Sequence, residues 1–358
     1  MTIRSRLASG KSRKKLIHKM VLLILLTLII GAVIVAMTLF RYILKPNVRL
    51  SGNEPVSIYI HSDDTYYDVK NLLYVKGLII NRKSFEWVAA RKNYPAAVKP
   101  GHYLIKSSMS NNDLVNMLRS GAQTPVKVIF NNIRKKEELA GRVSLQIEAD
   151  SMSLIKCWND REYLKSLNTS PEKILMIFLP NTYEFWWTTD AYEFTSRMYG
   201  EFQKFWDEER KQKARSARLD IEEVIILASI VEKETQKNDE KPVIAGVYLN
   251  RLQKDWPLQA DPTVVYAWGD FGMKRVLTIH TKINSPYNTY INRGLPPGPI
   301  CMPSIASIDA VLNFQKHDYM FFCAKADNSG YHSFSRTLAE HNRYARAYQQ
   351  ALNERKII

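Results

Sequence analysis

The chain has 358 residues, with 51 lysines and arginines against 35 aspartates and glutamates, which gives a formal net charge of +16. At about 150 residues per domain this length predicts two or three domains, and a hydrophobic content of 46% argues against a disordered chain. Three cysteines, with no CxxC or HxxxH spacing, argue against a disulfide scaffold and against a metal site, and no cofactor is expected.

The positive charge is concentrated at the N-terminus. Residues 1–49 contain ten lysines and arginines and no acidic residue, so the rest of the chain carries only +6. Nucleic-acid binding is typically marked by a basic face on a folded domain. The charge distribution therefore argues against a nucleic-acid partner.

The first predicted element is an apolar helix over residues 20–40, interrupted only by two threonines and a glycine. A helix of about 20 residues crosses the hydrocarbon core of a bilayer. The run is longer than the apolar region of a cleavable signal peptide and lacks a suitable cleavage site. Seven basic residues precede it and three follow, so residues 1–19 are expected in the cytoplasm. The sequence predicts a single-pass, type II protein of the inner (cytoplasmic) membrane.

Short β-rich runs, each followed by a helix-like segment, recur after a predicted linker at residues 41–55. The expected strand and helix pairs are 56–60 with 66–79, 102–106 with 112–119, and 126–130 with 135–147. This alternation predicts an α+β fold. A small module is expected over 56–125, and a connecting region over 126–219 includes a strongly charged helix at 201–219.

The last predicted domain, 220–358, opens on a strong helix start, because Asp220 and Glu223 form a capping box. At 100° per residue, Glu232 lies in line with an apolar row of this helix, whereas Glu234 points from the opposite side. Burial on such a face raises the pKa of a carboxyl, as a general acid near neutral pH requires. A buried structural ion pair is the other interpretation of Glu232.

Six ordered blocks resemble the signatures of one enzyme family. They lie at 228–235, 246–252, 258–266, 285–290, 294–300 and 332–334. They are similar to those of the endolytic murein transglycosylases, membrane-anchored enzymes that cut nascent peptidoglycan strands. The resemblance implies a lysin-motif-like module in the N-terminal part and an α+β catalytic domain after it. The chain departs from the family pattern at Asn181, where Asp is usual, and at 301–304, where Asn-Pro-Gly is commoner.

By this resemblance Glu232 matches the family's catalytic acid. It would protonate the glycosidic oxygen between N-acetylmuramic acid and N-acetylglucosamine. As a base it would then take the proton of the muramyl 6-hydroxyl as that oxygen attacks C1, which leaves an anhydromuramyl end. Substrate binding is expected from residues whose amides, hydroxyls and rings suit acetamido sugars: Gln259, Asp261, Thr263, Tyr287, Asn288, Thr289 and Tyr290. The alternative for these residues is a structural turn.

The implied role is to limit the elongation of glycan strands, outside the cytoplasm and in the periplasm if the cell is Gram-negative. The implied partners are peptidoglycan strands, the membrane and a glycan-polymerising synthase. Two other functions stay open. A muramidase would use water, with Asp261 as the second carboxylate. A non-catalytic scaffold would bind glycan through the lysin-motif-like module alone.

Overall fold

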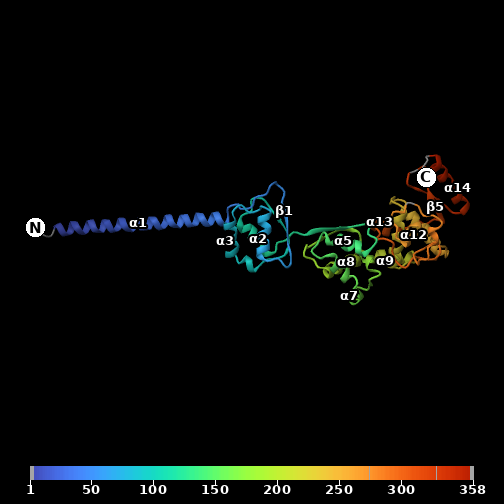
Figure 1. Cartoon of the computed structure of the whole chain (residues 1–358), viewed down its shortest axis with the longest axis horizontal. Helices are drawn as coiled ribbons and strands as arrows, with labels where there is room; N and C mark the ends of the chain where they lie inside the picture. The colour runs from blue at the N-terminus through green and yellow to red at the C-terminus, as the bar shows by residue number, and fades with distance from the viewer. Residues whose placement is uncertain (1–3, 274, 328, 355–358) are drawn as a thin grey trace. The chain divides into compact units, whose positions relative to one another are not determined.

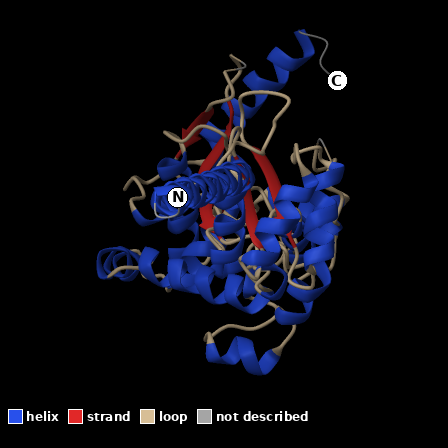
Figure 2. Ribbon diagram, turned by 90° about the vertical axis from the view of Figure 1, so that its left-hand side faces the viewer, coloured by secondary structure: helices blue, strands red, loops and turns tan. Residues whose placement is uncertain are grey.

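The computed structural model describes residues 4–273, 275–327 and 329–354 (Figure 1). In this part of the chain, three two-stranded sheets lie among a larger number of helices (Figure 2). The fold is therefore a helix-rich α+β fold. The chain divides into two compact units, the first ending at Val126 and including Trp186–Thr188, and the second formed by Lys127–Phe185 and the chain from Thr189 on.

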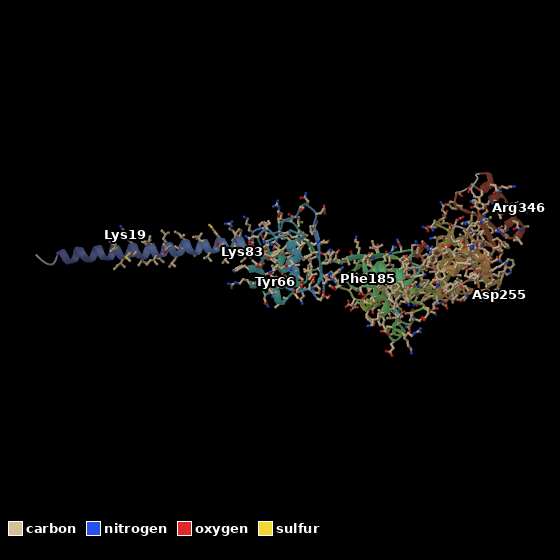
Figure 3. All side chains as sticks on the ribbon, viewed as in Figure 1. Lys19, Tyr66, Lys83, Phe185, Asp255 and Arg346 are labelled. Atoms are coloured by element: carbon tan, nitrogen blue, oxygen red, sulfur yellow. The ribbon has the colours of Figure 1, made fainter. Side chains whose placement is uncertain are left out.

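The N-terminal element is a long helix, α1 (Arg4–Ile43). Its part from Lys15 to Ile43 is long and apolar enough to cross a membrane. The large apolar side chains between Leu16 and Phe40 are exposed, and Figure 3 shows them standing out along the helix beyond Lys19. A helix with an apolar surface that no protein covers is suited to lipid. This helix is consistent with the predicted single-pass anchor.

In the first unit, two helices lie along the chain between the two strands that pair with each other. The elements are β1 (Val56–Ile60), α2 (Tyr66–Val75), α3 (Arg82–Arg91), a 3-10 turn η1 (Tyr94–Ala96), β2 (Gly101–Ile105) and α4 (Asn111–Ser120). β1 and β2 are antiparallel, with Val56 opposite Ile105. The strands and the helices α2 and α4 confirm sequence predictions, whereas α3 was not predicted. Phe85 on α3 is fully buried in the core of this unit.

Part of the predicted linker at 41–55 packs into the first unit. Val48 is buried and forms an isolated bridge with Ile79. The Asn47 side chain donates to the carbonyl of Asn81 at 3.0 Å and to Oδ1 of Asn111 at 2.7 Å. The Pro and Gly pattern correctly ends the helix, but these hydrogen bonds hold the following residues in place.

The first half of the second unit holds β3 (Val126–Phe130), which pairs with β4 (Asn181–Phe185). Its helices are α5 (Lys136–Ser144), α6 (Ser151–Cys157), α7 (Arg161–Ser166), η2 (Ile174–Ile177), α8 (Ala191–Phe205) and α9 (Glu208–Ser216). The predicted charged helix at 201–219 is therefore the end of α8 followed by α9. The helix breaks because Trp206 is buried and Asp207 caps α9 by accepting from the backbone NH of Arg210 at 2.8 Å.

The second half of this unit is organised around α10 (Ile221–Glu234). The other elements are α11 (Lys241–Gln253), α12 (Asp261–Trp268), η3 (His280–Lys282), α13 (Ile305–Leu312), β5 (Phe321–Ala324), β6 (His332–Ser335) and α14 (Leu338–Glu354). The predicted capping box is confirmed, with Asp220 and Glu223 exchanging hydrogen bonds of 2.8 Å. All eight residues from Val224 to Val231 are buried against α11, α12 and α13.

Candidate active site

The last carboxylate of α10, Glu234, lies at the end of the buried helix. Its Oε1 accepts a hydrogen bond of 2.5 Å from the Tyr248 hydroxyl on α11. Burial, with a smaller effect of the nearby Asp261 charge, raises the pKa of Glu234 to about 7 against the opposing effects of the Tyr248 hydrogen bond and the Arg251 charge. A carboxyl with such a pKa is partly protonated near neutral pH, so it is able both to donate and to accept a proton.

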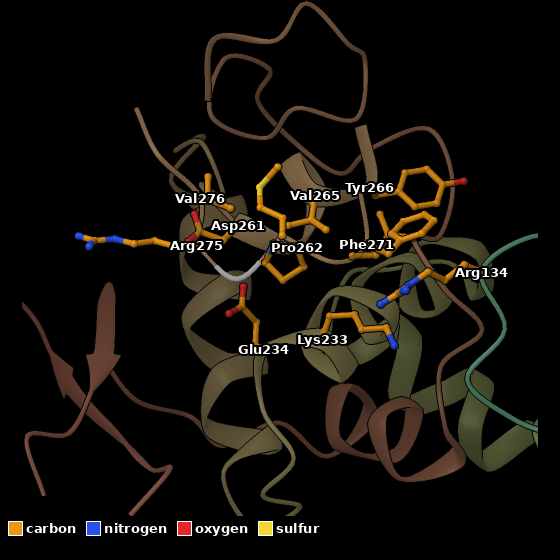
Figure 4. Close-up of a pocket in the computed structure, with 12 residues that line it drawn as sticks. Arg134, Lys233, Glu234, Asp261, Pro262, Val265, Tyr266, Phe271, Arg275 and Val276 are labelled. Atoms are coloured by element: carbon orange, nitrogen blue, oxygen red, sulfur yellow. The ribbon is translucent and has the colours of Figure 1, made fainter. Parts of the chain in front are cut away.

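Asp261, the first residue of α12, faces the same region as Glu234 (Figure 4). The Tyr290 hydroxyl donates to its Oδ1 at 2.5 Å. The residue as a whole is exposed, yet the protein packed around its carboxyl raises the pKa of Asp261, while the Tyr290 hydrogen bond opposes that rise. The two carboxyls thus each have one tyrosine partner.

Two cavities meet at this carboxyl pair. The Arg134 cavity has a volume of about 370 Å³, and its lining includes Arg134, Lys233, Tyr266 and Phe271. The Tyr290 cavity has a volume of about 290 Å³, and its lining includes Tyr248, Arg251, Gln259, Tyr290, Phe321 and His341. Glu234 and Asp261 line both cavities. An elongated ligand that occupied both would therefore pass the two carboxyls at its middle.

Glu232 has a different environment and lines neither of these cavities. Its Oε2 accepts hydrogen bonds from the hydroxyls of Ser304 and Ser307, each at 2.5 Å, and from Lys241 Nζ at 3.2 Å. Burial alone would raise the pKa of Glu232, but the two serines and Lys241 together lower it. The predicted rise in its pKa is therefore wrong, and the structural ion pair is the interpretation that the geometry favours.

Three of the expected substrate-binding residues are buried and engaged within the protein. Thr263 and Thr289 join their hydroxyls at 2.8 Å beside the backbone of Ala260. The Asn288 amide donates to the carbonyls of Thr281 and Ile283 at 2.9 and 2.8 Å. All three side chains are almost completely covered. Thr263 and Thr289 hold the start of α12 against the segment around 288, and Asn288 ties that segment to residues 281–283. Substrate contact by these three residues stays a prediction.

The other expected residues divide between the cavity and the packing around it. Gln259 and Tyr290 line the Tyr290 cavity beside Asp261. Tyr287 instead packs against Tyr266, with ring centroids 4.8 Å apart. Gln259, Asp261 and Tyr290 therefore remain candidates for substrate contact.

Glu234 was set aside at the sequence level because it lies off the apolar row of its helix. That row is packed into the core, where a general acid would not reach a substrate. The informative signal was the helix end itself, since Thr235 is extended and leaves Glu234 at the margin of the buried helix. Arg134 and Lys233 were also missed, because a basic residue in a loop or near a helix end carries no distinctive pattern.

Among the described residues, no group of three histidine, cysteine, aspartate or glutamate side chains is placed to hold a metal ion. The two carboxyls of raised pKa, Glu234 and Asp261, offer proton transfer. The linings of the two cavities also hold hydrogen-bonding side chains and aromatic rings, which suit a polar ligand with apolar faces, such as a sugar chain.

Comparison with known proteins gives a consistent result. The model of the YceG-like family matches residues 58–347. A protein of Bacillus subtilis (strain 168) named endolytic murein transglycosylase is 27% identical over 330 residues, which cover 88% of this chain and 90% of that protein. A protein of the same name from Streptococcus pneumoniae (serotype 2, strain D39) is 28% identical over 318 residues, which cover 80% of this chain and 57% of that protein.

One solved structure also resembles this chain. The crystal structure of a YceG-like protein from Listeria monocytogenes aligns with a TM-score of 0.55 and 28% sequence identity. The alignment covers 82% of this chain and 99% of that one. The likeness therefore includes most of the residues described above, among them both units.

Proposed function

The chain belongs to the YceG-like family, and we propose that it is an endolytic murein transglycosylase, as its relatives are named. It would cut nascent peptidoglycan strands between N-acetylmuramic acid and N-acetylglucosamine and so limit their elongation. The observation that carries this proposal is the pair of cavities that meet at Glu234 and Asp261. A cut in the interior of a strand requires binding space on both sides of the reacting bond.

Within this proposal, Glu234 takes the role of acid and base. Its protonated carboxyl donates a proton to the glycosidic oxygen as the bond to C1 of the muramyl sugar breaks. The ionised carboxylate then accepts the proton of the muramyl 6-hydroxyl, whose oxygen bonds to C1. The products are an anhydromuramyl end and a free 4-hydroxyl on N-acetylglucosamine, and no water is consumed.

The environment of Glu234 supports both halves of this cycle. A pKa of about 7 leaves a substantial protonated fraction at neutral pH, because burial disfavours the charged form. The Tyr248 hydroxyl donates to the same carboxyl and stabilises it once it has lost its proton. Tyr248 is itself buried on α11, so its hydroxyl is held in position.

Asp261 supports a second candidate function. It lines both cavities with Glu234, so a water molecule activated by Asp261 would convert the same site into a muramidase. Against this, the Tyr290 hydroxyl already occupies Oδ1 of Asp261. We therefore assign Asp261 to stabilising positive charge at C1 in the transition state.

The rest of the chain is assigned by the same proposal. The first unit, in which β1 and β2 pair around α2 and α3, is proposed to be the lysin-motif-like glycan-binding module. α1 is proposed to be a type II anchor in the cytoplasmic membrane, with both units outside the cytoplasm. A glycan-polymerising synthase that supplies nascent strands is the proposed partner.

Products from uncrosslinked glycan strands test the function. The wild-type chain is expected to leave anhydromuramyl ends, measured by mass spectrometry. Glu234→Gln keeps the shape of the side chain but cannot exchange the proton, so its turnover should fall by about 100-fold or more.

Glu232→Gln is the matched control on the same helix. It should destabilise the fold by about 2–4 kcal/mol, because it leaves the buried Lys241 without its partner. Its activity per folded molecule should nevertheless stay close to that of the wild type. If the wild type instead left reducing ends, the reaction would be that of a muramidase and the transglycosylase proposal would be wrong. Full activity of Glu234→Gln would exclude Glu234 as the acid.

A further inference from the structure

One end of the Arg134 cavity carries two cationic side chains, Arg134 and Lys233. Figure 4 shows Lys233 extending toward Arg134, whereas Arg275 extends the other way. Neither of the two forms an ion pair with a carboxylate among the residues that the structure describes. The acids that line this cavity are Glu234 and Asp261, and the pKa of each is raised by burial.

Both cations are held in place by neighbours that leave their charge unneutralised. The Arg134 guanidinium stacks on Phe271, with its carbon 4.3 Å from the ring centroid. Lys233 Nζ donates to Oδ1 of Asn132 at 2.5 Å. Lys135 lies over the same Phe271 ring at 5.9 Å and adds to the local positive charge. Glu138 accepts a hydrogen bond from the backbone NH of Arg134 at 3.1 Å, not from its guanidinium.

Like charges that lie close together without a counter-ion repel each other, and the repulsion is relieved when an anion binds between them. Arg134 comes from the connection between β3 and α5, and Lys233 comes from α10. The tertiary structure thus brings two distant segments together at one end of a cavity whose other wall holds Glu234. Arginine and lysine held in this way suit a carboxylate ligand.

We propose that Arg134 and Lys233 form a subsite for carboxylates of the peptide stems carried by the glycan strand. The inference rests on the proposed function, in which a peptidoglycan strand is the substrate. The sugars of such a strand carry uncharged amides and alcohols, so its carboxylates are those of the stems. A stem bound there places the muramyl sugar that bears it next to Glu234. The subsite therefore makes the enzyme prefer strands that keep their acidic stems.

The test uses the full chain in detergent with three preparations of uncrosslinked strands. One preparation carries intact stems, and one has its stem carboxylates converted to amides. The third has had its stems removed by an amidase and the lactyl carboxylates freed in that step converted to amides. Arg134→Gln and Lys233→Gln should each lower kcat/KM on the intact strands by about tenfold. Neither should change kcat/KM on stem-free or amidated strands, and Arg134→Lys should keep most of the preference.

Lys254→Gln is the matched control, because Lys254 is an exposed cation at the end of α11 that lines neither cavity. The wild-type preference for intact stems should also weaken as salt rises, while the activity of Arg134→Gln, which keeps only Lys233 of the two cations, should depend less on salt. An equal loss of activity on all three preparations would overturn the subsite, since the two cations would then support Glu234 or the fold.

Binding separates this inference from the proposed reaction. Strand affinity is measured with Glu234→Gln, with and without Arg134→Gln, so that no turnover is needed. Tighter binding of intact than of amidated strands, lost with Arg134→Gln, supports the subsite even if the wild type leaves reducing ends. Equal affinity for the two preparations overturns it, whatever products the wild type forms.

Discussion

Two glutamates that lie two residues apart on α10 differ in the direction of their pKa shifts. Burial raises the pKa of Glu234 to about 7, whereas hydrogen bonds from Ser304 and Ser307 and the charge of Lys241 outweigh burial at Glu232 and lower its pKa. The side chains point to different sides of one helix. The number and kind of donors that each side chain meets therefore decide which of them is able to carry a proton near neutral pH.

This difference predicts opposite effects of pH on stability. Because the folded pKa of Glu234 lies above its ordinary value of 4.5, the protonated side chain stabilises the folded state. This stabilisation is fully present below pH 4.5 and is lost as pH rises through about 7. In urea unfolding, the free energy of unfolding of Glu234→Gln relative to that of the wild type should therefore be about 1–3 kcal/mol higher at pH 8 than at pH 5. The lowered pKa of Glu232 gives stability that is present above its unfolded value and lost in acid.

Glu232→Gln is the comparison for this measurement, because its disadvantage should shrink as pH falls below about 4.5. A pH dependence of the same sign in both variants would contradict the assigned shifts.

At the scale of elements, polar side chains fix how the helices meet. Ser304 caps α13 and donates with Ser307 to Glu232, which ties the start of α13 to α10. In the first unit, Asn111 donates to the carbonyl of Tyr42 at 2.8 Å and to Ser84 at 3.0 Å. Asn111 is completely buried, so each of these contacts replaces a hydrogen bond to water.

Loss of the Asn111 amide should therefore destabilise the first unit alone. Asn111→Ala removes the partners of Asn47 and of the Tyr42 carbonyl and should cost about 2–4 kcal/mol. Calorimetry of the full chain should show an earlier transition for this unit, with the transition of the second unit unchanged. Asn112→Ala, at a half-buried neighbouring position on α4, is the control. A shift of both transitions would show that the units unfold together.

At the scale of the whole molecule, charge and apolar length are concentrated in one segment. Most of the net charge of +16 comes from residues 1–49, and the large apolar side chains of α1 from Leu16 to Phe40 are exposed. The basic residues before the apolar stretch fit the proposed orientation of this helix in a membrane. The charge gives no reason to assign a nucleic-acid surface.

Orientation should follow these basic residues. Changing the seven lysines and arginines before residue 20 to glutamine should leave a fraction of chains inverted, because the bias across the span is lost. Labelling of a cysteine introduced at the exposed Lys254 by a membrane-impermeant reagent measures that fraction. Correctly inserted chains should cut strands at the wild-type rate, and unchanged labelling would show that the charges do not set the topology.

Much of the fold could be predicted because its signals are local. The capping box at Asp220 and the strands at 56–60 and 126–130 all follow from neighbouring residues. α3 was not predicted, because its apolar residues are few and its burial depends on distant strands. The break between α8 and α9 escaped notice for the same reason, since it depends on the burial of Trp206.

The sequence by itself determined the family, the apolar N-terminal helix and the helix that bears the site. Only the tertiary structure decided which carboxyl of that helix faces the cavities. Helix periodicity tells which residues share a face, but it does not tell whether that face meets a core or a ligand. The answer depends on Tyr248, Asp261 and Arg134, which lie on other segments and reach Glu234 or its cavity only when the chain is folded.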